Sequence, residues 1–203
     1  MNNFIYETPT KVYFGKDEEL KIGKLVAAYH PKKVLIHFGG GSARKSGLLD
    51  RVEASLSAEN IAYVELGGVV ANPELSLVRK GIALCQEEGV DFILAVGGGS
   101  VMDSSKDIAN GVANPEIDVW DFSLGKCVPE KTLPKAAILT LAAAGSEMSN
   151  SCVITNSETG EKRGYGCSCN RMNFAIENPE LTYTVSPYQT ACGAVDIAMH
   201  TIE

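Results

Sequence analysis

Short apolar runs alternate with amphipathic stretches between about residues 33 and 141 of the chain. A run of about six apolar residues is typical of a strand buried on both faces of a parallel sheet, and a period near 3.6 residues is typical of the covering helices. Strands are predicted at residues 33–38, 61–66, 91–96 and 135–141. Helices are predicted at residues 43–57, 73–88 and 101–112, with Asn72 as N-cap of the second. This order indicates an α/β fold with a doubly wound, mainly parallel sheet.

The pattern changes on both sides of this layer. Residues 4–14 alternate and end at Gly15, which predicts an edge strand or hairpin. Residues 153–155 and 162–165 flank a turn-rich segment and predict a second hairpin. Residues 174–176 predict a last strand, which Asn178 and Pro179 end.

The final segment, residues 186–203, predicts a helix with Ser186 as N-cap, Pro187 as its first residue and Gln189 completing a capping box. One face carries an apolar stripe, expected to meet a core, that consists of Tyr188, Ala191, Cys192, Val195, Met199 and Ile202. Asp196 and His200, four residues apart at the flank of the stripe, are either two ligands of a divalent metal or an ordinary surface pair. Stable sites use at least three protein ligands, so such a site is incomplete within these residues.

Net charge, hydropathy and cysteine spacing argue against several classes of protein. The net charge is −7 and no basic cluster exceeds Arg44-Lys45, which argues against nucleic acid as a partner. No apolar run approaches the roughly 18 residues of a membrane span, and the N-terminus lacks the basic and apolar regions of a signal peptide, so a cytoplasmic location is expected. The six cysteines are scattered and are expected to be free thiols, including the close pair Cys167 and Cys169.

Candidate chemistry begins where two predicted strands run into glycine clusters, both reading Gly-Gly-Gly-Ser, at residues 39–42 and 97–100. Glycine lets the backbone approach a ligand, and the helix that follows offers unpaired N–H groups and a positive dipole end. Either cluster alone could serve only a tight turn. Two of them at the carboxyl edge of one sheet favour a dinucleotide lying across both.

Neither cluster matches the full G-x-G-x-x-G fingerprint, because Arg44 and Met102 occupy the third glycine positions. The first cluster also lacks the carboxylate that an NAD-selective site sets against the ribose 2′-hydroxyl. Gly40, Gly41 and Ser42 stand there instead, with Arg44 beyond them. NADP(H) is therefore predicted over NAD(H), although Arg44 and Lys45 could also be a solvated helix start.

Further short motifs recur in a fixed order along essentially the whole chain. They are Thr8-Pro9-Thr10 with Phe14-Gly15, the two Gly-Gly-Gly-Ser clusters, Asn72-Pro73, Asp103 with Lys106, Leu139-Thr140-Leu141 before Gly145-Ser146-Glu147, and Asp196 and His200 with Thr201 and Glu203. With these motifs the chain resembles the iron-containing (group III) alcohol dehydrogenase family, and most closely its butanol-dehydrogenase-type, NADP-using aldehyde reductase branch.

The resemblance implies reversible hydride transfer between a primary alcohol or aldehyde and a nicotinamide, at a divalent metal, Fe²⁺ or Zn²⁺. It implies a dehydroquinate-synthase-like dinucleotide-binding domain over residues 1–184. In this domain the residues implied to hold the pyrophosphate, the nicotinamide half or the adenosine are Gly40, Gly41, Ser42, Asn72, Gly98, Gly99, Ser100, Asp103, Thr140, Ser149, Lys162, Leu181 and Thr182. Asp103 could equally be a helix-start residue, and Lys162 a hairpin lysine.

Asp196 and His200 match the family's first two metal ligands. Residues 185–203 would then be the first helix of a helical metal-binding domain whose remainder, with two histidine ligands, is absent from these 203 residues, so little activity is expected of this chain alone. Ala142, Ala143 and Ala144 stand where many relatives have a Pro and Thr, so a hydroxyl contact to the cofactor is expected to be missing. A homodimer through the N-terminal edge strand is implied.

Two other functions fit the sequence. One is a non-catalytic nucleotide-binding module whose role is dimerisation. The other is a polyol dehydrogenase similar to glycerol dehydrogenase, or a dehydroquinate-synthase-like enzyme, although the first glycine cluster and residues 145–147 favour the alcohol branch. His37, at the end of the first strand, is expected to be a packing residue or an adenosine-side contact.

Overall fold

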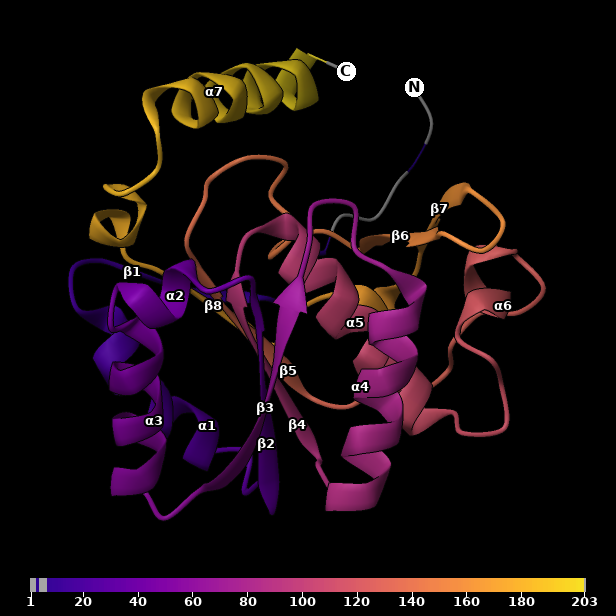
Figure 1. Cartoon of the computed structure of the whole chain (residues 1–203), viewed down its shortest axis with the longest axis horizontal. Coiled ribbons are helices and arrows are strands. Elements are labelled where there is room, and N and C mark those ends of the chain that lie inside the picture. The colour runs from indigo at the N-terminus through magenta and orange to yellow at the C-terminus, as the bar shows by residue number, and fades with distance from the viewer. Residues whose placement is uncertain (1–2, 4–6, 203) are drawn as a thin grey trace.

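The computed structural model describes residue 3 and residues 7–202 of the chain, which form an α/β structure around one parallel sheet (Figure 1). The sheet has six strands in the order β1-β8-β5-β4-β2-β3, and every neighbouring pair is parallel. Its strands are β1 (Lys11–Phe14), β2 (Lys33–Gly39), β3 (Ala62–Val69), β4 (Phe92–Gly97), β5 (Lys135–Leu139) and β8 (Phe174–Glu177). The doubly wound, mainly parallel sheet expected from the alternating pattern is confirmed.

Helices cover both faces of the sheet. Figure 1 shows α1, α2 and α3 on one face and α4 and α5 on the other. The longer helices are α1 (Ile22–Ala27), α3 (Leu48–Ala58), α4 (Leu75–Glu88), α5 (Gly99–Ala113) and α7 (Pro187–Ile202). The short ones are η1 (Glu18–Lys21), α2 (Ser42–Lys45), α6 (Trp120–Ser123), η2 (Ser168–Asn170) and η3 (Pro179–Thr182).

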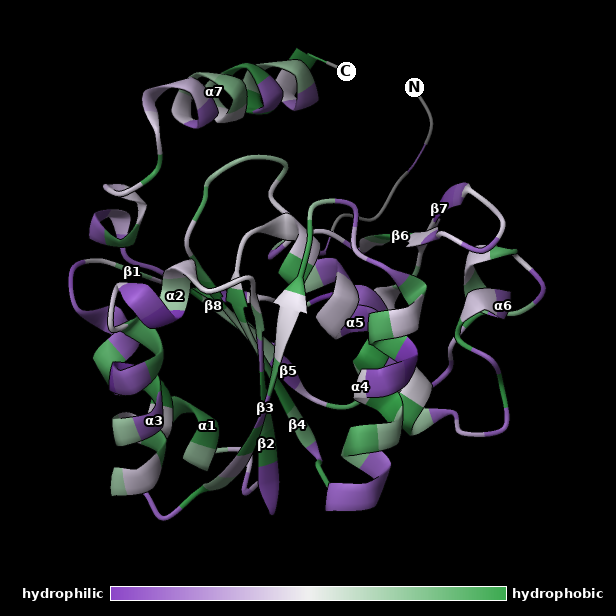
Figure 2. Cartoon of the chain, viewed as in Figure 1, coloured by the Kyte–Doolittle hydropathy of each residue, from purple (hydrophilic) through white to green (hydrophobic). Residues whose placement is uncertain are grey.

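Alternate residues of each central strand enter different cores, which explains why the middle of these strands is mostly apolar (Figure 2). Val34 and Ile36 of β2 pack with α1 and α3, whereas Leu35 packs with α4 and α5. All three side chains are fully buried. Burying a residue of this size contributes roughly 1.5–3 kcal/mol, so the two cores fix the sheet between its helix layers.

A separate hairpin lies against α5. Strands β6 (Ser151–Asn156) and β7 (Glu161–Gly166) pair antiparallel, as the turn-rich segment between them predicted. Cys152 and Ile154 of β6 enter the same core as α5, so they anchor the hairpin on that side of the sheet.

Two helix boundaries differ from the sequence prediction. The helix expected over residues 43–57 is two helices, because Ser46 and Gly47 interrupt it and Gly47 takes a left-handed φ of 71°. The helix expected from Pro73 begins at Leu75, and Glu74 rather than Asn72 is its N-cap. Asn72 has φ 57°, a conformation that asparagine tolerates in loops better than most residues do.

Helix α7 lies across the carboxyl edge of the sheet (Figure 1). The backbone N–H of Gln189 donates to Ser186 Oγ over 3.2 Å, so the predicted N-cap is confirmed. Its only buried residue in the described part of the chain is Gly193, where a Cβ would stand 2.5 Å from the carbonyl oxygen of Ala142. The helix therefore meets the loop after β5 backbone to backbone.

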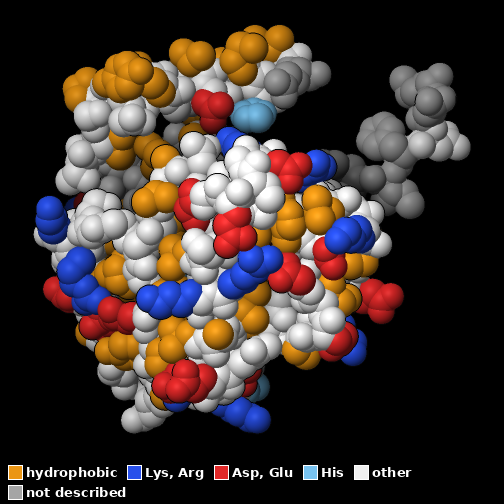
Figure 3. All heavy atoms as spheres, turned by 45° about the vertical axis from the view of Figure 1, so that its right-hand side comes forward, with side chains coloured by type: hydrophobic (Ala, Val, Ile, Leu, Met, Phe, Trp, Pro, Cys, Tyr) orange, Lys and Arg blue, Asp and Glu red, His pale blue; other side chains and the backbone are white. Residues whose placement is uncertain are grey.

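The apolar stripe of α7 does not face a core, contrary to expectation. Tyr188 is 75% exposed and Ile202 is 77% exposed, and Figure 3 shows hydrophobic side chains gathered along this helix at the top of the molecule. The helical period identifies residues that share a face but not what covers that face. Among the described residues, no helix has the length and apolar character that crossing a bilayer requires.

Candidate functional site

The two glycine turns lie side by side, because β2 and β4 are hydrogen-bonded neighbours. β2 ends at Gly39 and β4 at Gly97, and a helix follows each turn. Gly41, the residue before α2, has φ 134°, which favours glycine, and a Cβ there would meet nothing within 4 Å. The first turn therefore exposes its backbone to open space at the carboxyl edge.

A cleft of about 540 Å³ runs between these turns and η3. It is large enough for part of a dinucleotide, since ligand pockets are typically about 300–1,000 Å³. Four of the predicted cofactor residues line it together, namely Ser42, Gly98, Thr140 and Leu181. Gly40 follows the lining residue Gly39, in the same turn as Gly41, with nothing within 4 Å of a Cβ placed on it.

The start of α5 supplies the second turn with helix N–H groups. Gly98 precedes the helix in extended conformation, and Gly99 and Ser100 are its first two residues. A helix of this length directs unpaired amides and a positive dipole end at whatever occupies the cleft. Anions are therefore favoured at this point of the sheet edge.

Asp103, in the first turns of α5, has bonds within the protein to both carboxylate oxygens. Ser146 Oγ donates to one over 2.7 Å, and the backbone N–H of Val153 donates to the other over 3.1 Å. The side chain thus ties α5 to the loop after β5 and to β6. Both of its carboxylate oxygens are therefore engaged by other elements of the protein.

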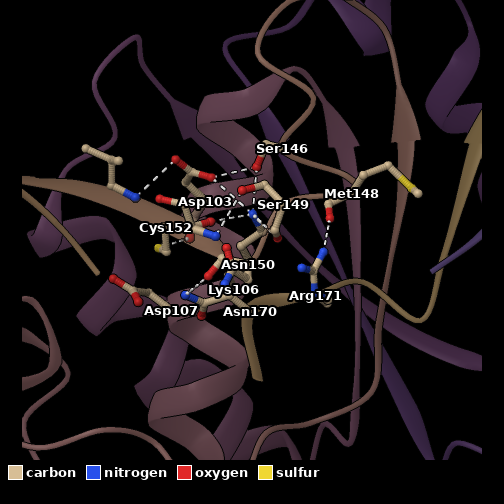
Figure 4. A network of polar contacts seen from close by, with 12 residues as sticks. Asp103, Lys106, Asp107, Ser146, Met148, Ser149, Asn150, Cys152, Asn170 and Arg171 are labelled. Atoms are coloured by element: carbon tan, nitrogen blue, oxygen red, sulfur yellow. Dashed lines mark hydrogen bonds and ion pairs between the residues drawn. The ribbon is translucent and has the colours of Figure 1, made fainter. Parts of the chain in front are cut away.

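A buried lysine, Lys106, holds the loop between β5 and β6 (Figure 4). Its Nζ donates to Ser146 Oγ over 2.8 Å, to the carbonyl of Ser149 over 3.3 Å and to the carbonyl of Ser151 over 2.6 Å. Nζ also lies 3.5 Å from the carboxylate of Asp103. An ammonium group out of water needs such partners, so the loop is fixed wherever this network is intact.

The remaining cofactor candidates lie around the rim. Lys162 Nζ donates to Asn72 Oδ1 over 2.8 Å, so the structure joins two predicted residues that are far apart in sequence. Ser149 Oγ accepts from the backbone N–H of Ser151 over 3.0 Å. Thr182 Oγ1 donates to the Pro179 carbonyl over 2.8 Å and closes η3. These contacts position the residues without showing what they bind.

His37 is a packing residue and does not reach the cleft. Its Nδ1 lies 2.7 Å from the Leu66 carbonyl oxygen, so Nδ1 carries the proton, and Nε2 accepts from Ser104 Oγ over 2.8 Å. The ring joins β2, β3 and α5. Burial disfavours the charged imidazolium and lowers the pKa of His37 to about 4.

Asp196 and His200 face the same side of α7, with 3.8 Å between Oδ1 and Nε2. Both side chains are about half exposed. A carboxylate and an imidazole are ligands that either Fe²⁺ or Zn²⁺ accepts, so the pair fits part of a metal site. Within residue 3 and residues 7–202, no group of three or more His, Cys, Asp or Glu side chains could hold a metal.

Three residues of the site escaped the sequence analysis as site residues. Lys106 was noticed only as part of a motif, because a helical lysine is normally solvated. Arg51 and Glu180 line the cleft from α3 and η3. Arg51 lies four residues after Gly47, which was the available signal for that residue, whereas Glu180 lies far from both glycine turns in the sequence.

The parallel sheet, the two adjoining glycine turns and the cleft across them define a doubly wound α/β protein of dinucleotide-binding architecture. A model of the iron-containing alcohol dehydrogenases matches residues 9–179, and the chain belongs to this family. The resemblance inferred from the motifs is thereby confirmed.

Particular relatives cover the whole of this chain. NADH-dependent butanol dehydrogenase A of Clostridium acetobutylicum is 47% identical over 203 residues, which are 52% of that protein. NADPH-dependent aldehyde reductase YqhD of Escherichia coli is 38% identical over 205 residues, again 52% of that protein. The crystal structure of NADH-dependent butanol dehydrogenase A from Thermotoga maritima superposes with a TM-score of 0.97 at 41% identity, over 51% of its chain. The chain spans about half the length of the curated relatives that it matches.

Proposed function

We propose that this chain is the cofactor-binding half of a metal-dependent oxidoreductase that transfers hydride between a nicotinamide dinucleotide and a primary alcohol or aldehyde. One observation carries the proposal: a single cleft is lined by both glycine turns, by Thr140 after β5 and by η3. Family membership and the relatives named for alcohol or aldehyde chemistry support the reaction class.

In this proposal the pyrophosphate lies on the N-terminus of α5, where Gly98, Gly99 and Ser100 offer backbone donors. The adenosine ribose lies at Gly40 to Ser42, and Leu181 faces the adenine. NADP(H) is preferred over NAD(H), because the first turn carries no carboxylate to repel a 2′-phosphate. The network around Lys106 holds Ser149, and the backbone N–H of Thr140 donates to the Gly97 carbonyl over 3.1 Å, so both are positioned for the nicotinamide side.

Residues 185–203 would begin a second, helical domain in this proposal, with Asp196 and His200 as the first two ligands of Fe²⁺ or Zn²⁺. The metal would supply Lewis-acid polarisation of the substrate oxygen. Asp196 and His200 would hold it from one helical face, at the edge of the cleft. With two ligands alone, the 203-residue chain is expected to bind nucleotide without sustaining turnover.

Calorimetric titration of the chain with NADPH and then NADH, each with and without Zn²⁺ or Fe²⁺, tests the proposal. The expected result is tighter binding of NADPH that does not depend on metal. Failure to bind either nucleotide would mean that the glycine turns are only structural. That result would contradict the proposal.

Gly99→Glu provides a sharper version of the test. A carboxylate at the first turn of α5 suits the helix dipole, so the fold is retained, but the same charge repels a pyrophosphate. Nucleotide affinity is expected to fall roughly 10- to 100-fold, since each 1.4 kcal/mol is a factor of ten. Gln86→Glu, which adds the same charge at an exposed site on α4, serves as the matched control and should bind normally. Equal affinities for the two variants would contradict the placement of the pyrophosphate.

The edge strand β1 supports a homodimer. Its partner in the sheet is β8, its other edge is open, and Phe14 is 69% exposed. An open apolar edge is a ready template for pairing with a second copy. Phe14→Lys is expected to shift the chain from dimer to monomer in light scattering after gel filtration. Tyr183→Lys, at a similarly exposed site of 76%, is the control and should leave the dimer intact.

A second candidate function is a nucleotide-binding module whose role is dimerisation. The exposed apolar residues of α7 favour it, because such a face marks an interaction surface. Dimerisation that survives in a chain unable to bind either nucleotide would place this candidate first.

A further inference from the structure

We propose that Arg51, and not Arg44, is the cation that recognises the 2′-phosphate of NADP(H), so that it is a specificity-determining residue of the cleft. This inference rests on the proposed function, in which the cleft holds a nicotinamide dinucleotide. It corrects the sequence expectation, which placed Arg44 beside the first glycine turn for this purpose.

Arg44 is already occupied by carboxylates. Its guanidinium donates to Asp50 over 3.2 Å, to Glu65 over 2.5 Å and to Glu53. The guanidinium carbon also lies 5.8 Å from the centre of the Phe38 ring. One positive charge facing three carboxylates offers little attraction to a phosphate. The cleft lining does not include Arg44.

Arg51 differs from Arg44 in two respects: it lines the cleft, and fewer of its donors are taken up by carboxylates. It lines the cleft from the first turns of α3, beside Ser42, Ser46 and Leu48. In the described part of the chain its side chain donates one hydrogen bond, from Nη2 to Glu19 Oε1 over 3.3 Å. A guanidinium has five N–H donors in a planar fork, so donors remain for a ligand.

Glu19 forms an ion pair with Arg51 and helps to hold its side chain in place. Glu19 is 2% exposed, and its second oxygen accepts from Asn178 Nδ2 over 2.8 Å. A buried carboxylate fixed by an amide keeps its partner's guanidinium at one position. The Arg51 side chain still has 38% of its surface exposed. The Arg51 guanidinium is therefore both held in one orientation and accessible to a ligand.

The place of Arg51 in its helix also points to an anion. A cation in the first turns of a helix opposes the positive end of the helix dipole, which disfavours it unless negative charge lies nearby. Glu19 provides part of that charge, and a phosphate at the cleft wall would provide more. Glu180, the carboxylate that lines the cleft, is paired with Lys16 over 3.0 Å, so it does not cancel Arg51.

The arrangement fits the adenosine end of the proposed ligand. Ser42 lies at the turn where the ribose is placed, and Arg51 lines the same cleft. Leu48 and Leu181 are apolar and line the cleft beside them. A guanidinium binds a phosphate with two parallel hydrogen bonds, which a ribose 2′-hydroxyl cannot match. Arg51 would thus discriminate between the two cofactors.

Two small probes test this without catalysis. Adenosine 2′,5′-bisphosphate carries the 2′-phosphate, and 5′-AMP lacks it. Each is titrated calorimetrically into the wild-type chain and into Arg51→Gln, which keeps a donor for Glu19. Arg51→Gln is expected to lose about 10- to 100-fold in affinity for the bisphosphate, the usual worth of hydrogen bonds to a charged group, and less than about threefold for 5′-AMP. Arg44→Gln is the matched control and should change neither.

Several outcomes would overturn the inference. Equal losses for both probes would assign Arg51 to adenine stacking or to support of the fold, and a selective loss in Arg44→Gln would return the role to Arg44. A wild-type chain that binds the two probes equally would refute 2′-phosphate recognition while leaving the proposed cofactor site in place. A wild-type chain that binds neither probe would overturn both. Arg51→Lys keeps the charge without the fork, and an intermediate loss for the bisphosphate alone is expected if Arg51→Gln folds poorly.

Discussion

Replacing Lys106 with methionine is expected to lower the free energy of unfolding by about 3–5 kcal/mol, the cost of removing one partner from a buried ion pair. Lys106 is fully buried, and Asp103 lies at its ammonium group. Methionine has nearly the same length but no donor, so the carbonyls of Ser149 and Ser151 lose their buried partner. The loop between β5 and β6 would loosen, and nucleotide affinity should fall with it.

Urea denaturation followed through the fluorescence of the single tryptophan, Trp120, measures this effect. Lys126→Met is the matched control, because the Lys126 side chain is 62% exposed and forms a surface ion pair with Asp121. Such a pair contributes about 0–1 kcal/mol. Similar small losses in the two variants would show that Lys106 does not hold the loop.

Stability is expected to fall by about 3 kcal/mol between pH 6.5 and pH 4 because of His37 alone, at 1.36 kcal/mol for each unit between its ordinary pKa of 6.5 and its pKa of about 4 in the fold. Above pH 6.5 the ring is neutral in both states, and its contribution is fully present. As the pH falls below 6.5, His37 binds a proton in the unfolded chain but stays neutral in the folded chain. The loss is complete near the folded pKa.

The measurement is the difference in unfolding free energy between the wild-type chain and His37→Gln, taken at about pH 7 and about pH 4.5. A difference is needed because Asp107 acts in the opposite direction: burial raises the pKa of its carboxyl to about 7, so its contribution is present at low pH and is lost as the pH rises. The wild-type advantage should shrink toward low pH. A difference that stays constant over this range would refute the assignment to His37.

The periodicity of the apolar residues was sufficient to predict the sheet and its helix layers. Strands such as β2 and β4 are apolar on both faces, and a buried parallel sheet is the structure that needs this. The break between α2 and α3 was missed, because the apolar period continues across Ser46 and Gly47 and only the backbone of Gly47 reveals the turn. Arg51, which follows this break in α3, lines the cleft.

The candidate site was predicted less completely than the fold. Backbone donors at the glycine turns follow from sequence, since two strands of one sheet that each end in glycines before a helix place unpaired N–H groups together at the carboxyl edge. Side chains that act through partners distant in the sequence cannot be predicted in this way. Lys106 meets carbonyls from residues more than forty positions away, and Arg44 of α2 meets Glu65 of β3. No local pattern contains those contacts.

The contact of Gly193 with the Ala142 carbonyl fixes one point of α7 against the loop after β5. Backbone stands against backbone there, so no side chain can yield or repack, and the spacing at that one point is fixed. A tilt of α7 about this point would displace the residues further along the helix. With a rise of about 1.5 Å per residue, Asp196 lies roughly 4.5 Å and His200 roughly 10 Å from Gly193 along the helix axis. A small tilt of α7 would therefore move His200 about twice as far as Asp196 relative to the cleft.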